Sequence, residues 1–300
     1  MHYYSLNEYL KKKYGEKIYK ISLDGGMTCP NRDGTLSSKG CIFCSKGGSG
    51  EFSADRKLTI TEQIEQAKLR IKAKTDCKKF IAYFQPFTNT YASVDYLRKI
   101  FYEAIENPEI AILSIATRPD CLGDDVVGLL SELNKIKPVW IELGLQTIHK
   151  TTSDYIRRCY ELDVYDNAVK RLKNNNIEII THIILGLPYE TKEMMLESVR
   201  YAGERSNGIK LQLLHVLKDT DLFDEYENGK FRTLEMEEYI DLLCDCIEIL
   251  PENVVVHRLT GDGDKKLLVA PLWSADKKRV LNSIDKTFRE RNVAQGKRYI

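Results

Sequence analysis

The sequence lacks the features of a membrane, secreted or disordered protein. No apolar run approaches the roughly 20 residues that a membrane-spanning helix needs. The first residues, MHYYSLNEYLKKKYGEK, contain no apolar segment typical of a secretory signal. No low-complexity tract, linker or short internal repeat interrupts the chain. Its 300 residues, 43% hydrophobic and 30% charged, therefore predict a globular cytoplasmic protein of one or two domains, without a membrane partner.

Net charge is also nearly absent, because 45 Lys and Arg oppose 44 Asp and Glu. This balance conceals an uneven distribution along the chain. Residues 1–20 contain five lysines against two glutamates, and residues 265–300 contain ten basic residues against three acidic ones. The ends thus carry +3 and +7, and the segment between them carries −9. Such ends indicate either two solvated helices or, if both face one groove, a track for nucleic-acid phosphates.

The eight cysteines lack the setting of a disulfide framework, because a reducing cytoplasm keeps thiols free. Three of them, Cys29, Cys41 and Cys44, lie in one loop rich in Gly and Ser with the spacing C-x11-C-x2-C. This loop contains neither a histidine nor the fourth cysteine that a closed structural zinc site requires. Three thiolates suit a [4Fe–4S] cluster that leaves one iron open. Zinc and chance buried thiols remain the alternatives.

Short apolar runs alternate with amphipathic stretches along the chain. The expected strands are residues 18–23, 80–84, 111–116, 139–145, 178–185 and 209–216, with a further one at 254–259. The expected helices are residues 61–74, 94–106, 124–135, 164–174, 192–205 and 234–249, with a final one at 275–293. This alternation predicts an α/β fold around a buried parallel sheet, either an open barrel or a doubly wound sheet. In both, ligands bind at the C-terminal ends of the strands.

The cysteine loop, with Phe43 just before its last cysteine, resembles that of the radical S-adenosylmethionine (SAM) superfamily, although its first cysteine gap is longer than usual. The resemblance implies that Cys29, Cys41 and Cys44 hold a [4Fe–4S] cluster whose open iron takes the amino and carboxylate groups of SAM. A reductant such as flavodoxin or ferredoxin would supply the electron that cleaves SAM to a 5′-deoxyadenosyl radical. That radical abstracts a hydrogen atom from the substrate.

Later segments carry the same resemblance. The segment ELGLQTIHKTTSDYIRRCY resembles the radical SAM half of the Elongator catalytic subunit and part of oxygen-independent coproporphyrinogen oxidase. This implies that Gln146 helps to hold SAM and that Arg158 pairs with its carboxylate, for which a guanidinium is well shaped. The segments IATRPDCL and THIILGLPYET resemble further parts of these enzymes. Ala116 stands where relatives have a Glu that binds the SAM ribose. We therefore expect Glu142 to bind the SAM ribose in its place.

Four further positions and one cysteine are assigned by their place in these segments. QPFTNTY follows the second strand where relatives have Gly-Gly-Glu, which makes Thr88 and Asn89 candidates for binding the SAM amino group. His182 lies where some relatives have an Asp near the SAM sugar, with a core histidine as the alternative. Arg118 and Cys121 lie where active-site loops begin and are candidate catalytic residues. For Cys121 the alternative is a buried structural thiol.

The segments IKLQLLHVLKDTDL and HRLTGDGDKKLLVAPLWS extend the resemblance over the whole chain, to YtqA/YhcC-type radical SAM proteins. They include Arg258 and Asp262, which are candidates either for contacting substrate or for a structural ion pair. The resemblance implies a partial (β/α)6 TIM-like barrel at residues 1–260, N-terminal extension included, and a basic C-terminal helical extension at 261–300 packed on it.

The same branch implies a tRNA substrate. Its members are linked to conversion of the 5-carboxymethylaminomethyl group of the wobble uridine toward 5-aminomethyl, and the basic ends agree with an RNA partner. A second hypothesis keeps the radical chemistry but assigns a small substrate, such as a porphyrin-like molecule or a carboxylate. A third hypothesis is a zinc-bearing RNA-binding module without radical chemistry.

Overall fold

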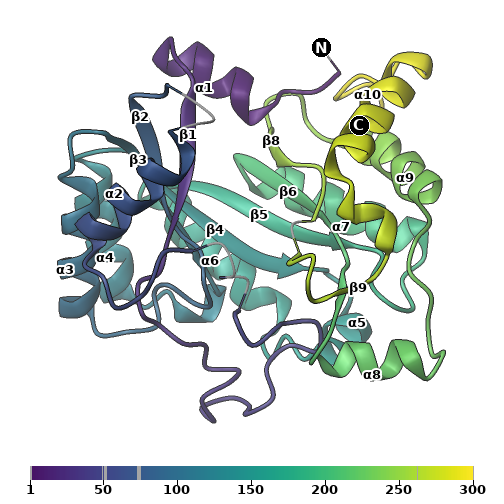
Figure 1. The fold of residues 1–300 in the computed structure, drawn as a ribbon, viewed down its shortest axis with the longest axis horizontal. Helices are drawn as coiled ribbons and strands as arrows, with labels where there is room; N and C mark the ends of the chain where they lie inside the picture. The colour runs from purple at the N-terminus through teal and green to yellow at the C-terminus, as the bar shows by residue number, and fades with distance from the viewer. Residues whose placement is uncertain (1, 49, 51–52, 73–75, 262, 300) are drawn as a thin grey trace.

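The computed structural model describes residues 2–48, 50, 53–72, 76–261 and 263–299. One curled sheet of seven parallel strands forms its centre, and the strands follow each other in chain order from β1 to β6 and then β8 (Figure 1). These strands are β1 (Ile18–Leu23), β2 (Lys79–Phe84), β3 (Ile110–Thr117), β4 (Val139–Gln146), β5 (Glu178–Leu185), β6 (Gly208–Leu213) and β8 (Val255–Arg258). The predicted partial TIM-like barrel is confirmed, with the strand expected at 254–259 as its seventh member.

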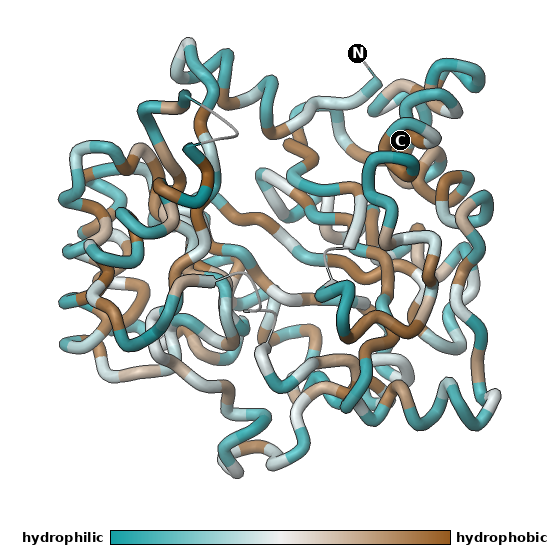
Figure 2. The backbone as a smooth tube through the Cα atoms, in the orientation of Figure 1, coloured by the Kyte–Doolittle hydropathy of each residue, from teal (hydrophilic) through white to brown (hydrophobic). Residues whose placement is uncertain are grey.

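Helices cover the outer face of the sheet, one after each of the first six strands. They are α2 (Ile60–Ile71), α3 (Val94–Ile105), α4 (Asp124–Asn134), α6 (Leu162–Asn174), α7 (Lys192–Arg205) and α9 (Met236–Ile249). Figure 2 shows hydrophobic segments along the strands and mixed colouring along these helices, as expected for helices with one buried face. The first begins at a capping box, in which Thr59 and Glu62 each accept a hydrogen bond from the other's backbone N–H.

The basic N-terminal segment forms α1 (Leu6–Tyr14), which lies against the N-terminal ends of the strands. Its buried Leu10 packs among inward-facing side chains from five strands. These are Ile18, Ile81, Ile112, Trp140 and Ile180. This helix therefore closes the end of the barrel opposite the cysteine loop, which follows the other end of β1 (Figure 1). The two basic ends consequently do not share one groove beside the cysteines, contrary to the arrangement considered from the sequence.

The remaining differences from the expected elements are local. The run at 209–216 divides into β6 and β7 (Val216–Leu217), and β7 pairs antiparallel with β9 (Leu268–Ala270), a ribbon too short for periodicity to indicate. Also unexpected are α5 (Lys150–Tyr155), α8 (Asp221–Glu227) and the 3₁₀ turns η1 (Pro119–Cys121) and η2 (Leu272–Ala275). The expected end of the first outer helix at residue 74 lies outside the described residues.

The basic C-terminal segment forms α10 (Lys277–Glu290), as expected. Val280, Ile284 and Phe288 on this helix are buried in the main core, and the Tyr3 ring meets Phe288 edge-on at 6.1 Å. The domain boundary at residue 260 falls between β8 and β9 and stays a prediction. Among the residues described, no helix is both long and apolar enough to span a bilayer.

Because Leu10 is 3% exposed at the centre of the apolar end of the barrel, Leu10→Ala should lower the free energy of unfolding by about 2–5 kcal/mol. Urea denaturation followed by circular dichroism measures the change. Lys12→Ala on the exposed side of the same helix is the matched control and should shift stability by less than about 0.5 kcal/mol. Equal midpoints for the two variants would show that α1 is not part of the core.

Candidate functional site

A cavity of about 250 Å³ opens at the C-terminal end of the sheet and continues into the barrel. Cys29, Cys41 and Cys44 line it near the strand ends, and Glu142 and Lys210 line it inside the barrel. It lies where parallel α/β folds place their active sites, because loops that follow neighbouring strands meet at that edge.

The cysteine loop follows β1, and contacts within its described residues 29–48 hold it in place. Cys44 donates its backbone N–H to the Cys41 carbonyl at 3.0 Å, which closes the C-x2-C turn. The Arg32 guanidinium donates to the Cys44 carbonyl at 2.6 Å. Gly48 adopts φ +56°, and a Cβ there would lie 2.4 Å from the Phe87 ring, so glycine is required on both counts. The loop is therefore held by its own backbone and by packing against the segment after β2.

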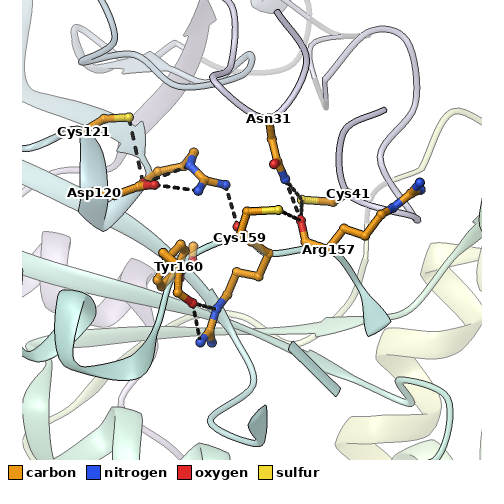
Figure 3. A network of polar contacts seen from close by, with 10 residues as sticks. Asn31, Cys41, Asp120, Cys121, Arg157, Cys159 and Tyr160 are labelled. Carbon is orange, nitrogen blue, oxygen red and sulfur yellow. Dashed lines mark hydrogen bonds and ion pairs between the residues drawn. The ribbon is translucent and has the colours of Figure 1, made fainter. Parts of the chain in front are cut away.

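A second set of contacts holds this loop against the segment that follows α5. Asn31 donates its amide to the Arg157 carbonyl at 2.6 Å and approaches the Cys41 sulfur at 3.5 Å, as Figure 3 shows. Ile42 donates its backbone N–H to the Ile156 carbonyl at 3.2 Å. Side-chain donors that approach sulfur are the kind of contact that tunes iron–sulfur clusters. Asn31 is a functional candidate that the sequence analysis missed.

The donor set of three cysteines fits a [4Fe–4S] cluster that leaves one iron open. Burial, and then the neighbouring Cys44, raise the pKa of the Cys41 thiol to about 12, while Arg118 opposes them. Binding iron would therefore displace a proton from this thiol. Among the described residues, no three His, Cys, Asp or Glu side chains converge enough to hold one ion. A [4Fe–4S] cluster does not need such convergence, because each thiolate binds its own iron.

The end of β4 brings Gln146 to the same cavity, and the segment after β4 brings Arg158 there. Arg158 is 2% exposed and donates to the carbonyls of Leu145, Thr147 and Tyr160 at 2.6–3.2 Å. These contacts use four of the five guanidinium N–H groups. Gln146 ends β4 in the left-handed region, at φ +64°. Arg158 thus fixes the turn that carries Gln146, and its role toward SAM stays a prediction.

Arg118 immediately precedes η1 and Cys121 is its last residue. The two side chains face different surroundings. Arg118 lines the cavity and forms a two-pronged ion pair with Asp120, at 2.9 and 2.7 Å. It also donates to the Arg158 carbonyl at 2.9 Å. Cys121 does not line the cavity, and its thiol points to Asp120 (Figure 3). Burial raises the pKa of this thiol to about 12. A protonated thiol outside the cavity lining favours the structural alternative for Cys121 over a reactive one.

Thr88 and Asn89, the candidates after β2, also differ in their position relative to the cavity. Thr88 lines the cavity and is 1% exposed. Asn89 lies outside the lining, and its side-chain amide donates to the carbonyls of Phe84, Pro86 and Ala116 at 2.9–3.1 Å. Asn89 therefore joins the ends of β2 and β3, and Thr88 is the residue that faces the space available to a ligand.

Inside the barrel, Glu142 is surrounded by donors from four strands. Its Oε1 accepts from Lys20 and Ser114, each at 2.7 Å. Its Oε2 accepts from Lys210 and pairs with the His182 ring nitrogen at 2.8 Å. These four partners match the roughly four acceptor positions of a carboxylate. Glu142 therefore bonds to His182 and to both lysines, which leaves the Glu142 oxygens no position for a SAM ribose hydroxyl.

The charge states of this cluster follow from burial and from its members' mutual fields. Burial opposes ionisation of Glu142, but Lys20 and Lys210 prevail and hold its pKa well below the usual value. Burial, reinforced by Lys20 and Arg258, lowers the pKa of Lys210 to about 7 against the attraction of Glu142. Burial and Lys210 lower the pKa of His182 to about 4, so this ring is neutral at pH 7.

Sequence reasoning missed Lys20, Lys210 and Tyr83, whose hydroxyl lies 3.1 Å from the Lys210 ammonium. A signal was available in IYKISL and GIKLQL, where a lysine lies in the middle of a mostly apolar strand of a buried sheet. Charged residues are rarely buried unless they are paired, so these lysines indicate a polar centre inside the barrel. Asp262 lies outside the described residues.

Comparison with known proteins agrees with this arrangement. The model of the radical SAM superfamily matches residues 31–202, and the model of the radical SAM C-terminal domain matches residues 206–290. The chain belongs to the radical SAM superfamily, and it is an enzyme of that class. Members of this superfamily use a [4Fe–4S] cluster and SAM.

Within this superfamily, the chain is similar to several known relatives and to one solved structure. YtqA of Bacillus subtilis is 44% identical over 98% of this chain and 92% of its own length. YhcC of Escherichia coli is 34% identical over 95% of this chain and 91% of its own. A tRNA uridine(34) acetyltransferase of Methanocaldococcus jannaschii is 24% identical over 50% of this chain and 28% of its own. The structure of Methanocaldococcus infernus Elp3 has the same fold, with a TM-score of 0.69 at 16% identity, covering 93% of this chain and 64% of that one.

Each of the variants Cys29→Ala, Cys41→Ala and Cys44→Ala should lose iron, sulfide and visible absorbance after anaerobic reconstitution, because a cluster needs all three thiolates. Iron and sulfide assays alongside absorbance spectra measure this. Cys77→Ala, at a thiol away from the cavity, is the matched control and should keep the full cluster. A wild-type protein that stays colourless and binds zinc instead would contradict the cluster.

Proposed function

We propose that this radical SAM enzyme acts on the wobble uridine of tRNA and converts its 5-carboxymethylaminomethyl group toward 5-aminomethyl. The observation that carries the proposal is one cavity with three cysteines near the strand ends and the buried Lys210 inside the barrel. Such a cavity suits a substrate group that is both narrow and anionic. The relative named tRNA uridine(34) acetyltransferase and the Elp3 fold support a tRNA substrate.

In this proposal Cys29, Cys41 and Cys44 hold the cluster, and Thr88, Gln146 and Arg158 line the space beside it for SAM. When bound, these groups supply a radical able to remove a hydrogen atom from a C–H bond. The protein's own contribution is to hold the substrate in the cavity and to exclude water from it. A reductant such as flavodoxin or ferredoxin and a cytoplasmic location, where tRNA is available, complete the proposal.

Exposed basic side chains follow two glycines that line the cavity, and they suit an RNA backbone. Gly261 and Gly263 line the cavity, and the chain continues from them to the start of α10. The exposed basic residues on this stretch are Lys265, Lys266, Lys277, Lys278 and Arg279. A wobble nucleotide that leaves its stack can then enter the cavity while neighbouring phosphates stay outside.

A small carboxylate is the second candidate substrate. The same cationic end of the cavity would accept a free carboxylate as well as one attached to RNA. The two substrates differ in salt dependence, because binding of an RNA backbone releases many counterions and binding of a small carboxylate releases few.

Cells that lack this enzyme should accumulate 5-carboxymethylaminomethyl-uridine in tRNA and lose the forms derived from 5-aminomethyl-uridine. Mass spectrometry of tRNA nucleosides measures both pools. Complementation with the wild-type gene should restore the profile, and complementation with Cys41→Ala should not, because the reaction needs the cluster. An unchanged nucleoside profile in the deletion strain would reject the tRNA proposal and move the small carboxylate to first place.

Replacing Lys277, Lys278 and Arg279 by Gln should weaken tRNA binding and flatten its dependence on salt, with a slope change of about 0.7–0.9 for each phosphate that the protein no longer neutralises. Fluorescence anisotropy at several salt concentrations measures this. The matched control replaces three exposed lysines at the opposite end of the barrel, Lys11, Lys12 and Lys17. Equal effects of the two triple variants would indicate general charge attraction in place of a tRNA surface at the mouth.

A further inference from the structure

The turn that follows β5 places an aromatic residue where the backbone favours glycine. Pro188 and Tyr189 are its central residues, and the Glu190 N–H closes it by donating to the Leu187 carbonyl at 3.2 Å. Proline fixes φ near about −65°, and Tyr189 follows at φ +68°, which is the pattern of a type II turn. The third residue of such a turn is usually Gly or Asn, and a bulky residue there strains the backbone. The geometry of the turn therefore does not explain a tyrosine.

Packing does not explain it either. The Tyr189 side chain is 66% exposed, whereas Leu187 in the same turn is 3% exposed and packs in a hydrophobic cluster. The Tyr189 ring meets the ring of Tyr155 edge-on, with the centroids 5.3 Å apart. An edge-on contact covers at most one face of a ring, so a flat face of Tyr189 stays available to a partner.

This ring lies beside the cysteine loop. Tyr155 ends α5 and precedes Ile156, whose carbonyl accepts from the backbone N–H of Ile42 in the cysteine loop at 3.2 Å. The next residue of that loop, Phe43, lines the cavity, and it packs against the same hydrophobic cluster as Tyr155. Tyr189 is outside the lining. A partner of Tyr189 would therefore lie next to the reaction space without entering it.

The charged groups joined to Tyr155 and to the segment after it are paired. Glu225 on α8 accepts from the Tyr155 hydroxyl at 2.6 Å and pairs with Lys230 at 3.5 Å. Asp221, at the start of α8, pairs with Arg157 at 2.7 Å. These two ion pairs leave little net positive charge to attract a phosphate. An exposed aromatic face, in contrast, suits the flat face of a nucleobase.

We propose that Tyr189, supported by Tyr155, stacks on a base of the RNA substrate that neighbours the wobble nucleotide. The inference rests on the proposed function and identifies how the anticodon loop is held. When a wobble nucleotide leaves its stack, its neighbour loses a stacking partner. The Tyr189 ring, outside the cavity lining, replaces that partner while the phosphates meet the basic side chains of residues 265–279. The strained turn is then retained for the RNA and not for the fold.

The test measures binding of the reconstituted protein to an anticodon stem–loop with an unmodified wobble uridine, by fluorescence anisotropy. Tyr189→Ala should bind at least about fivefold more weakly, the lower end for loss of one stacked base. Tyr189→Phe should keep the affinity, because stacking needs the ring and not the hydroxyl. The matched control is Tyr299→Ala, which should also keep it. Tyr299 is 43% exposed and lies at the other end of the sheet, near Gln295, whose side chain donates to the Val254 carbonyl at 2.8 Å.

Tyr189→Gly separates a role in RNA binding from a role in the fold. Glycine relieves the strain of the positive φ and also removes the ring. This variant should therefore lose affinity as Tyr189→Ala does, while its Tm stays at or above that of the wild type. If the tyrosine served the fold, Tyr189→Gly would instead lower the Tm, and that result would overturn the inference.

Full affinity in Tyr189→Ala, equal losses in Tyr189→Ala and Tyr189→Phe, or no binding by wild type would also overturn it. Unchanged RNA affinity with altered self-association of Tyr189→Ala in sedimentation would overturn it and assign the ring to a contact between copies of the chain. The reaction is judged separately, by mass spectrometry of a stem–loop that carries 5-carboxymethylaminomethyl-uridine. Affinity that depends on Tyr189 without conversion would support the stacking site and reject the proposed reaction. Conversion with full affinity in Tyr189→Ala would reject the stacking site alone.

Discussion

The structure depends on how a curled parallel sheet fills its own interior. Such strands are buried on both faces, so one row of side chains meets the helices and the other meets the inside of the barrel. Here the inside is apolar where α1 closes it and charged around Glu142. That carboxylate takes donors from β1, β3, β5 and β6, so one side chain connects strands from both halves of the sheet.

A buried ionic cluster of this kind is weak support for stability, because desolvation offsets much of the attraction between its members. Its value lies in fixing a set of charges inside the cavity. Water there cannot reorient freely to weaken them. The cysteine loop places the thiols at the other end of the cavity. Arg32, Asn31 and Gly48 fix the backbone around them. Rigid elements thus position both ends of one reaction space.

The sequence predicted the six principal strands, the outer helices and the cysteine loop, because alternation and ligand spacing are local patterns. It did not indicate which face of each strand turns inward, so Lys20 and Lys210 went unassigned while Glu142 was assigned to SAM. Asn89 has the chemistry of a ligand, but its amide binds three backbone carbonyls, and only the folded backbone reveals that. Charge counting likewise found the basic N-terminus without indicating that α1 lies at the far end of the barrel.

The closure of the barrel by α1 has a kinetic consequence. A barrel open at both ends would let a substrate enter from one side and its product leave from the other. With Leu10 and Trp140 closing the far end, a group that reaches Lys210 must withdraw past the cysteine loop along the route by which it arrived. Product that has not withdrawn therefore occupies the path of the next substrate, so the two compete for one entrance.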